Sequence, residues 1–137
     1  DKGQSKLLIS KLGLKKNVQW YSVQDRKNIM LMINLCDVGV GEVGHMSSIT
    51  YGSLCEFMCL AKPIIGNLDV EYNKKNNQEI YPIYNVDNSQ DVYQAMHEIF
   101  LDYEQAKISG EKNQIWFEKY VISDGLKNII STIELQN

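Results

Sequence analysis

Residues 37–66 constrain the fold of this 137-residue chain more than any other stretch of its sequence. The apolar run at 38–40 predicts a short buried strand, and a polar, glycine-containing loop follows at 41–50. A helix-like run at 52–61 then leads into a second apolar run at 63–65. Strand, loop, helix and strand in this order form a βαβ unit, which predicts a parallel sheet.

The loop at 41–50 and the start of the helix at Gly52 are expected to meet at the carboxyl edge of that sheet, where ligands of α/β proteins bind. The first backbone N–H groups of a helix have no partner within the helix, and the helix dipole favours a negative charge there. This edge is therefore the expected ligand site, and its chemistry suits an anion such as a phosphate.

Further helices and strands are expected on both sides of this unit. Before it, the sequence predicts a helix at 4–13, a strand at 17–22, and a helix at 26–35 that is capped by Asp25 and buried on most sides. After it, the sequence predicts a loop at 67–79, an irregular strand at 80–86, a long helix from Asn88 or Ser89 to Tyr103, a break at Gly110, and helices at 114–120 and 123–133.

The alternation of short strands and helices predicts an α/β fold with a Rossmann-like, doubly wound, mostly parallel sheet in three layers and a helical carboxyl-terminal tail. The length suits a single domain over residues 1–137. Such a domain normally opens on its central strand, whereas this chain opens on a predicted helix, so we expect a partial domain that lacks its opening strand or strands. An unpaired sheet edge invites pairing with a second chain, which predicts an altered strand order or a homodimer.

The charge pattern argues against a nucleic-acid partner, because the formal net charge is −3 and the densest basic stretch, residues 11–16, holds only three lysines. The sequence shows neither a signal peptide nor an apolar run of eighteen residues, so a cytoplasmic location is expected. Three cysteines, Cys36, Cys55 and Cys59, suggest free buried thiols in a reducing compartment. Too few further ligands accompany them for a metal site, and no metal or cofactor is expected.

Residues 56–65 read EFMCLAKPII and resemble the pattern lEamacGkPvia of GT-B fold glycosyltransferases of the group 1 family. The pattern belongs to the carboxyl-terminal, donor-binding domain of that family. Weaker matches are Leu12, Gly13 and Leu14 followed by Asn17 and Val18, and the pair Cys36 and Asp37 before the strand. The resemblance extends over most of the chain, and its helices follow in the same order.

The resemblance implies that this chain is the donor-binding half of an enzyme that moves a sugar from a nucleoside-diphosphate sugar to a glycan or a lipid-linked acceptor. In such enzymes the acceptor binds an amino-terminal domain across a cleft, so we expect the isolated chain to bind donor weakly without turnover. The resemblance also implies a role in polysaccharide biosynthesis, with peripheral membrane association of the full-length protein, and the Lys-, Asn-, Ile- and Tyr-rich composition points to a bacterial source.

The family also implies individual site residues. A glutamate at the position of Glu56 accepts hydrogen bonds from the ribose hydroxyls, and a carboxylate can accept from both. The second family glutamate, eight residues earlier, is replaced here by Ser48, which leaves the anomeric outcome and the catalytic residues open. The loop and helix start that would face the donor add Ser48, Ile49, Thr50, Tyr51 and Gly52 to Glu56 as expected nucleotide contacts. The same loop adds Gly44, His45 and Ser47 as expected contacts of the sugar or the diphosphate.

Other interpretations stay open at this point. Glu56 can be a solvated helix residue, and Thr50 or Ser53 can be a simple helix cap. A sugar-nucleotide epimerase of related fold would carry acids and histidines placed for proton abstraction. A non-catalytic α/β binding module, for example a receiver-like domain, would carry acids at its strand ends, where the sequence offers only Asp37 at the start of a strand.

Overall fold

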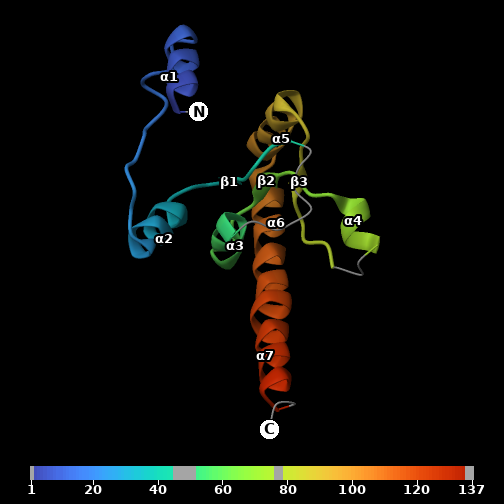
Figure 1. Cartoon of the computed structure of the whole chain (residues 1–137). Helices are drawn as coiled ribbons and strands as arrows, with labels where there is room; N and C mark the ends of the chain where they lie inside the picture. The colour runs from blue at the N-terminus through green and yellow to red at the C-terminus, as the bar shows by residue number, and fades with distance from the viewer. Residues whose placement is uncertain (1, 45–51, 76–78, 135–137) are drawn as a thin grey trace.

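The chain is a mixed α/β protein in which helices surround a small parallel sheet (Figure 1). The structure is a computed structural model that describes residues 2–44, 52–75 and 79–134. Its helices and strands are α1 Lys2–Lys11, α2 Arg26–Asn34, β1 Gly39–Val40, α3 Gly52–Cys59, β2 Ile64–Gly66, α4 Val70–Lys75, β3 Tyr84–Asn85, α5 Ser89–Leu101, α6 Tyr103–Trp116, the π-helix η1 Phe117–Ser123 and α7 Asp124–Glu134.

The three strands form one parallel sheet in the order β1-β2-β3, as the βαβ pattern predicts. Gly39 lies opposite Ile64, and Ile65 lies opposite Tyr84. Each strand has only two or three residues, so the predicted strand at 80–86 is reduced to β3. The doubly wound arrangement stays a prediction.

Helices cover both faces of the sheet because neighbouring residues of a strand point to opposite sides. Ile64 faces a core cluster with Leu54 and Met58 of α3, against which Trp116 at the end of α6 packs. Ile65 faces a second cluster that contains the buried residues Val86, directly after β3, Ala95 and Ile99 of α5, and Ala106 of α6. The centre of the molecule is therefore β2, which we take together with β1, β3, α3, α5 and α6 as the sheet body.

Gly110 does not break the long helix, so this prediction was wrong. It lies buried within α6, where the helix crosses the turn that precedes β2. A Cβ atom at this position would lie 2.1 Å from the carbonyl oxygen of Ala61 and 2.8 Å from its carbonyl carbon. Gly110 therefore allows the backbone of α6 to lie against the backbone of the turn at Ala61. The helix then continues through η1 and α7 as one long rod (Figure 1).

The turn between α3 and β2 contains a strained residue. Ala61 has φ +54°, which is the left-handed region that ends many helices and usually holds glycine. The N–H group of Ala61 donates to Met58 at 3.0 Å, and that of Lys62 donates to Phe57 at 3.0 Å. These bonds satisfy the last carbonyls of α3 and direct the chain into β2.

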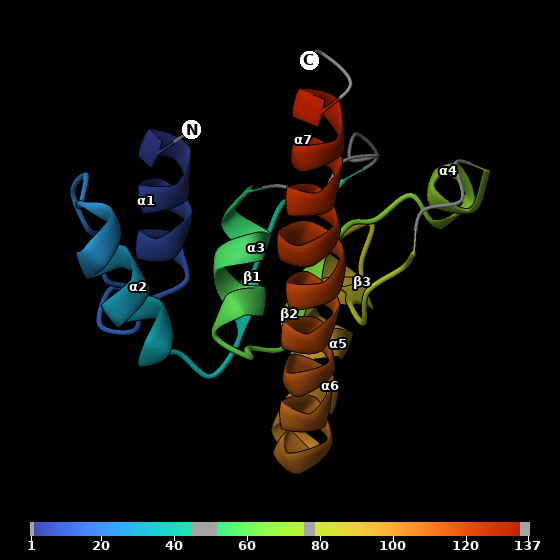
Figure 2. The same cartoon turned by 90° about the horizontal axis from the view of Figure 1, so that it is seen from below.

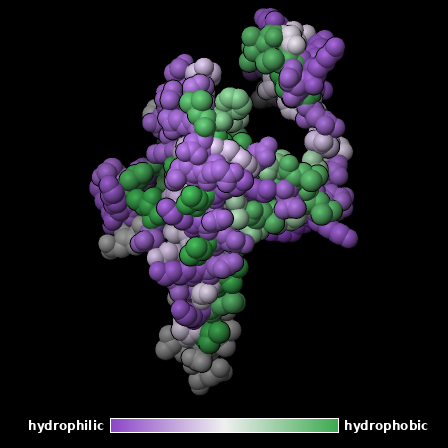
Figure 3. Space-filling view, turned by 180° about the vertical axis from the view of Figure 1, so that it is seen from behind, coloured by the Kyte–Doolittle hydropathy of each residue, from purple (hydrophilic) through white to green (hydrophobic). Residues whose placement is uncertain are grey.

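Residues 2–37, here called the amino-terminal arm, stand beside the sheet body, and an extended segment joins α1 to α2 (Figures 1 and 2). Ile33 is the one buried residue among residues 2–37, all of which the structure describes. The expected burial of α2 on most sides was therefore wrong. Figure 3 shows apolar surface on the side of the molecule where the amino-terminal arm lies.

The predicted strand at 17–22 was also wrong, because these residues form no strand in the structure. The aromatic and β-branched residues there favour an extended chain, but a strand needs a neighbour that accepts and donates its backbone hydrogen bonds. Trp20 is 44% exposed, and the Lys2 ammonium lies 5.8 Å from the centre of its ring. The segment packs locally with α1 instead of joining the sheet.

Local capping signals were read correctly. The side chain of Asp25 accepts a hydrogen bond from the N–H group of Asn28 at 2.9 Å and caps α2. Asn88 caps α5 by accepting from the N–H group of Gln90 at 2.8 Å. The expected loop at 67–79 contains an additional helix, α4, which Asp69 caps through the N–H group of Tyr72 at 2.8 Å.

Candidate functional site at the carboxyl edge of the sheet

The carboxyl edge of the sheet is formed by the residues that follow β1, β2 and β3. Pairing continues beyond β1, because Gly41 donates its N–H to Ile65 at 2.8 Å and Asn67 donates its N–H to Glu42 at 3.0 Å. The described part of the loop after β1, residues 41–44, is thus fixed at the top of the sheet. Gly44 lies there at φ +129°, a conformation that favours glycine.

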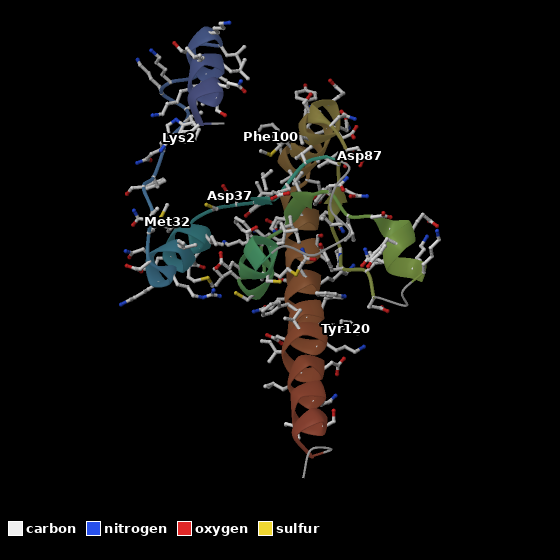
Figure 4. All side chains as sticks on the ribbon, in the orientation of Figure 1. Lys2, Met32, Asp37, Asp87, Phe100 and Tyr120 are labelled. Carbon is white, nitrogen blue, oxygen red and sulfur yellow. The ribbon has the colours of Figure 1, made fainter. Side chains whose placement is uncertain are left out.

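An amide network joins the ends of β2 and β3. The side chain of Asn67 donates to the carbonyl of Val86 and to the carboxylate of Asp87. The side chain of Asn85 accepts from the N–H group of Leu68 at 2.7 Å and donates to its carbonyl at 3.1 Å. These bonds hold the two strand ends together, and Asp87, labelled in Figure 4, stays exposed at this edge.

Glu56 lies in the second turn of α3, about 6 Å along the axis from the first residue of the helix. It points away from the core, because Leu54 and Met58, two positions before and after it, are the buried residues of α3. Its side chain is 20% exposed, and its Oε1 atom lies 3.2 Å from Nη1 of Arg26, the first residue of α2. The carboxylate therefore lies between two helices, close to solvent and paired with a cation.

A second polar contact joins the last residue of α2 to the turn that follows α3. The Lys62 ammonium donates a hydrogen bond to the carbonyl of Asn34, the last residue of α2, at 2.9 Å. A cation at this position suits the negative end of the α2 dipole. Because Arg26 meets Glu56 and Asn34 meets Lys62, α2 and α3 run in the same direction with their starting ends together.

The structure places some of the predicted site residues and leaves others outside the described part. His45, Ser47, Ser48, Ile49, Thr50 and Tyr51 lie outside the described residues. Gly52 is the exposed first residue of α3, and Gly44 lies at the top of β1. Glu56, Gly52 and Gly44 thus belong to the elements that flank the same edge of the sheet.

Sequence reasoning missed Arg26 as a partner of Glu56. The sequence contained one indication of this contact. Arg26 is a basic residue in the first turn of a helix, where its charge is unfavourable to the helix dipole. Such a residue is better explained by a partner elsewhere, although the sequence does not say which of the seventeen acidic residues it is. The pair spans 30 positions, and only the fold identifies it.

The three cysteines differ in their burial and therefore in their environment. Among the described residues, no group of three or more His, Cys, Asp or Glu side chains could hold a metal ion. Cys36 is exposed, which corrects the expectation of a buried thiol, while Cys55 and Cys59 are half-buried. Burial raises the pKa of the Cys55 thiol and that of the Cys59 thiol, so both favour the less reactive protonated form.

Comparisons of the chain with protein-family models, with curated proteins and with solved structures found no match. Within the described ranges, none of the helices is both long and apolar enough to cross a membrane. The function is therefore argued from the geometry of the sheet edge and from the sequence resemblance.

Proposed function

We propose that this chain is the donor-nucleotide-binding half of a GT-B-like glycosyltransferase, in which Glu56 accepts hydrogen bonds from the ribose hydroxyls of a nucleoside-diphosphate sugar. The observation that carries the proposal is the position of Glu56 in the second turn of α3, the helix that follows the loop after β1, with its side chain 20% exposed and paired with Arg26. An ionised carboxylate there can accept two vicinal hydroxyls through charge-assisted hydrogen bonds.

The strand order supports this proposal. Doubly wound sheets have the order 3-2-1-4-5-6, so one half of such a sheet contains three consecutive parallel strands, as β1-β2-β3 does. Gly39 and Gly41 donate their N–H groups to Pro63, just before β2, and to Ile65 of β2, so the N–H and C=O groups of Val40 point to the other side of β1. In a complete doubly wound sheet, the second half of the sheet would begin on this side of β1. Nucleotides bind where the two halves meet, because the strand order reverses there.

The backbone of the turn after α3 is a second, independent support. The family pattern lEamacGkPvia places its glycine at the position of Ala61, and Ala61 adopts the positive φ that glycine favours. The lysine and proline of the pattern coincide with Lys62, which contacts the end of α2, and with Pro63, which is fully buried. The motif residues therefore have local roles that fit the resemblance.

The proposed reaction breaks the bond between the sugar C1 and the diphosphate oxygen, and the nucleoside diphosphate leaves with the electron pair. A bond forms from C1 to an acceptor hydroxyl, and the released diphosphate or solvent takes up the hydroxyl proton. This chain contributes the ribose contact through Glu56, while N–H groups at the start of α3 suit the leaving diphosphate. The acceptor is oriented by a separate amino-terminal domain in the proposed assembly. Both stereochemical outcomes are compatible with these roles.

Calorimetric titration with UDP-, GDP- and ADP-linked sugars tests the proposal. We expect at least one donor to bind, and we expect Glu56→Gln to weaken its binding by about tenfold or more, because a charge-assisted hydrogen bond is lost. The matched control is Glu71→Gln on α4, whose side chain is 77% exposed and ion-paired with Lys74 at 3.6 Å. Equal binding by the wild type and Glu56→Gln, or no binding of any donor, would contradict the proposal.

A non-catalytic binding module is the second candidate, and one observation favours it. The amino-terminal arm contains an apolar hollow of about 410 Å³ whose lining includes Tyr21, Val23, Ile29 and Met32. Val23 is 100% exposed, and apolar surface of this kind marks many interaction sites. Light scattering over a range of concentrations tests this candidate for self-association: a homodimer supports it, and a monodisperse monomer counts against the dimer.

A further inference from the structure

We infer that Arg26 is a positioning residue for Glu56: it holds the carboxylate in the orientation that accepts the ribose hydroxyls. This inference rests on the proposed function and adds to it a residue that the family pattern does not assign. The contact joins Nη1 of Arg26 to Oε1 of Glu56 at 3.2 Å. It engages one carboxylate oxygen, and a hydroxyl can approach the other.

Both ends of the contact are held by their own elements. Arg26 is the first residue of α2, directly after the cap residue Asp25, whose two carboxylate oxygens accept from the backbone and side chain of Asn28 at 2.9 Å each. Glu56 is fixed on α3 between Leu54 and Met58, which are buried in the core. The direction from which Arg26 approaches is therefore set by the helix start, not by a free loop.

A second contact limits the movement of α2 relative to Glu56. The Lys62 ammonium bonds the Asn34 carbonyl at the far end of α2, so the helix is held at two separated points, to α3 through Glu56 and to the turn after α3 through Lys62. Rotation or sliding of α2 would break one of these contacts. Because Ile33 is the one buried residue of α2, apolar packing contributes little to its placement.

The exposure of the pair decides between a structural role and a positioning role. The Arg26 side chain is 76% exposed and that of Glu56 is 20% exposed, and ion pairs this close to water contribute little to stability. The pair can still select one rotamer of Glu56, because a charge-assisted hydrogen bond is directional. We therefore expect its loss to affect ligand affinity without a matching loss of stability.

A double-mutant cycle with the best-binding donor sugar tests the inference. Arg26→Met is expected to weaken donor binding about fivefold to tenfold in the wild-type background and to have no effect in the Glu56→Gln background, because coupled residues are not additive. Arg26→Lys should restore part of the loss, and Lys27→Met, which removes the same charge from a neighbouring exposed position, should change nothing. Thermal unfolding should be the same for all Arg26 variants and the wild type.

The outcomes separate this inference from the proposed function. Unchanged affinity in Arg26→Met, with donor binding that still depends on Glu56, would overturn the positioning role and leave the proposed function standing. Equal losses in both backgrounds would show that Arg26 contacts the ligand directly and would also overturn it. A wild-type chain that binds no donor sugar would refute the proposed function, and the inference would fall with it.

Discussion

The sheet body buries its apolar side chains in two clusters, one on each face of β2, whereas the amino-terminal arm buries only Ile33 of residues 2–37. Polar contacts such as those of Arg26 and Lys62 hold α2 against α3. Buried apolar side chains therefore dominate the body, whereas polar contacts join α2 to α3 and to the turn after it. The proposed ligand residue Glu56 lies at the boundary between the two, so its position depends on both.

The largest expected difference between the two regions is the effect of removing a methionine side chain. Met58 is fully buried in the body, and Met58→Ala should lower the free energy of unfolding by about 2–5 kcal/mol through lost burial and a cavity. Met32 of α2, labelled in Figure 4, is partly exposed, and Met32→Ala should cost less than about 1 kcal/mol. Urea denaturation of both variants measures the difference, and similar losses would contradict the division into body and arm.

A methyl group at the backbone crossing of α6 should have the next largest effect. Gly110→Ala places a Cβ atom 2.1 Å from the Ala61 carbonyl oxygen, and the required shift should cost about 1–3 kcal/mol. Gly125→Ala is the matched control, because nothing lies within 4 Å of its Cβ position in α7. That variant should gain up to about 1 kcal/mol from helix propensity. A neutral Gly110→Ala would show that α6 does not pack against the turn as described.

Thiol chemistry offers a third contrast between the regions. Cys36 of the arm is exposed, whereas burial raises the pKa of Cys55 and that of Cys59 in the body. Because the thiolate is the reactive form, a disulfide reagent at pH 8 should label Cys36 first and the two body thiols later. Mass spectrometry of time points identifies the order, and faster labelling of Cys55 than of Cys36 would contradict the burial of α3.

The same pKa shifts have a consequence for stability. A pKa raised in the folded state means that the folded protein keeps a proton which the unfolded chain releases above the ordinary value of 9.0. The two thiols therefore contribute stability below pH 9 that is lost as the pH rises through their folded pKa values. Urea midpoints at pH 8 and pH 10 should differ less in a Cys55→Ala, Cys59→Ala double variant than in the wild type.

The smallest expected effect concerns the turn that connects α3 to β2. Ala61→Gly removes the strain of a side chain at φ +54°, and a more flexible unfolded chain offsets part of the gain. The free energy of unfolding should rise by less than about 1 kcal/mol. Ala95→Gly, in the middle of α5 at ordinary helical φ, is the control and should be destabilised. A loss of stability in Ala61→Gly would show that the turn is not strained.

The sequence was sufficient where a few adjacent residues determine the outcome. Asp25 and Asn88 were recognised as helix caps because a cap bonds to N–H groups two or three residues away. The βαβ order predicted the parallel pairing of β1 and β2 for a similar reason, since one apolar helix separates two apolar strands. Such signals are local, and nothing in the rest of the molecule overrides them.

Predictions from the sequence were wrong or incomplete where the structure depends on a segment far away along the chain. Residues 17–22 have the composition of a strand but no neighbouring strand to pair with. Gly110 reads as a helix break, yet it is required by the Ala61 carbonyl 49 positions away. The contact of Arg26 with Glu56 is not visible in the sequence, because it depends on how α2 lies beside α3. Each of these outcomes depends on a contact between segments that are far apart along the chain.

The most direct test of ribose binding at Glu56 is a map of amide chemical shifts in a labelled chain titrated with UDP-, GDP- and ADP-linked sugars. We predict saturable shifts at the start of α3, from Gly52 to Glu56, and at Arg26 across from it. In Glu56→Gln the same shifts should need donor concentrations higher by about tenfold or more to saturate, because a charge-assisted hydrogen bond is lost. Shifts confined to the apolar hollow of the arm, or no shifts with any donor, would contradict a nucleotide site at this edge of the sheet.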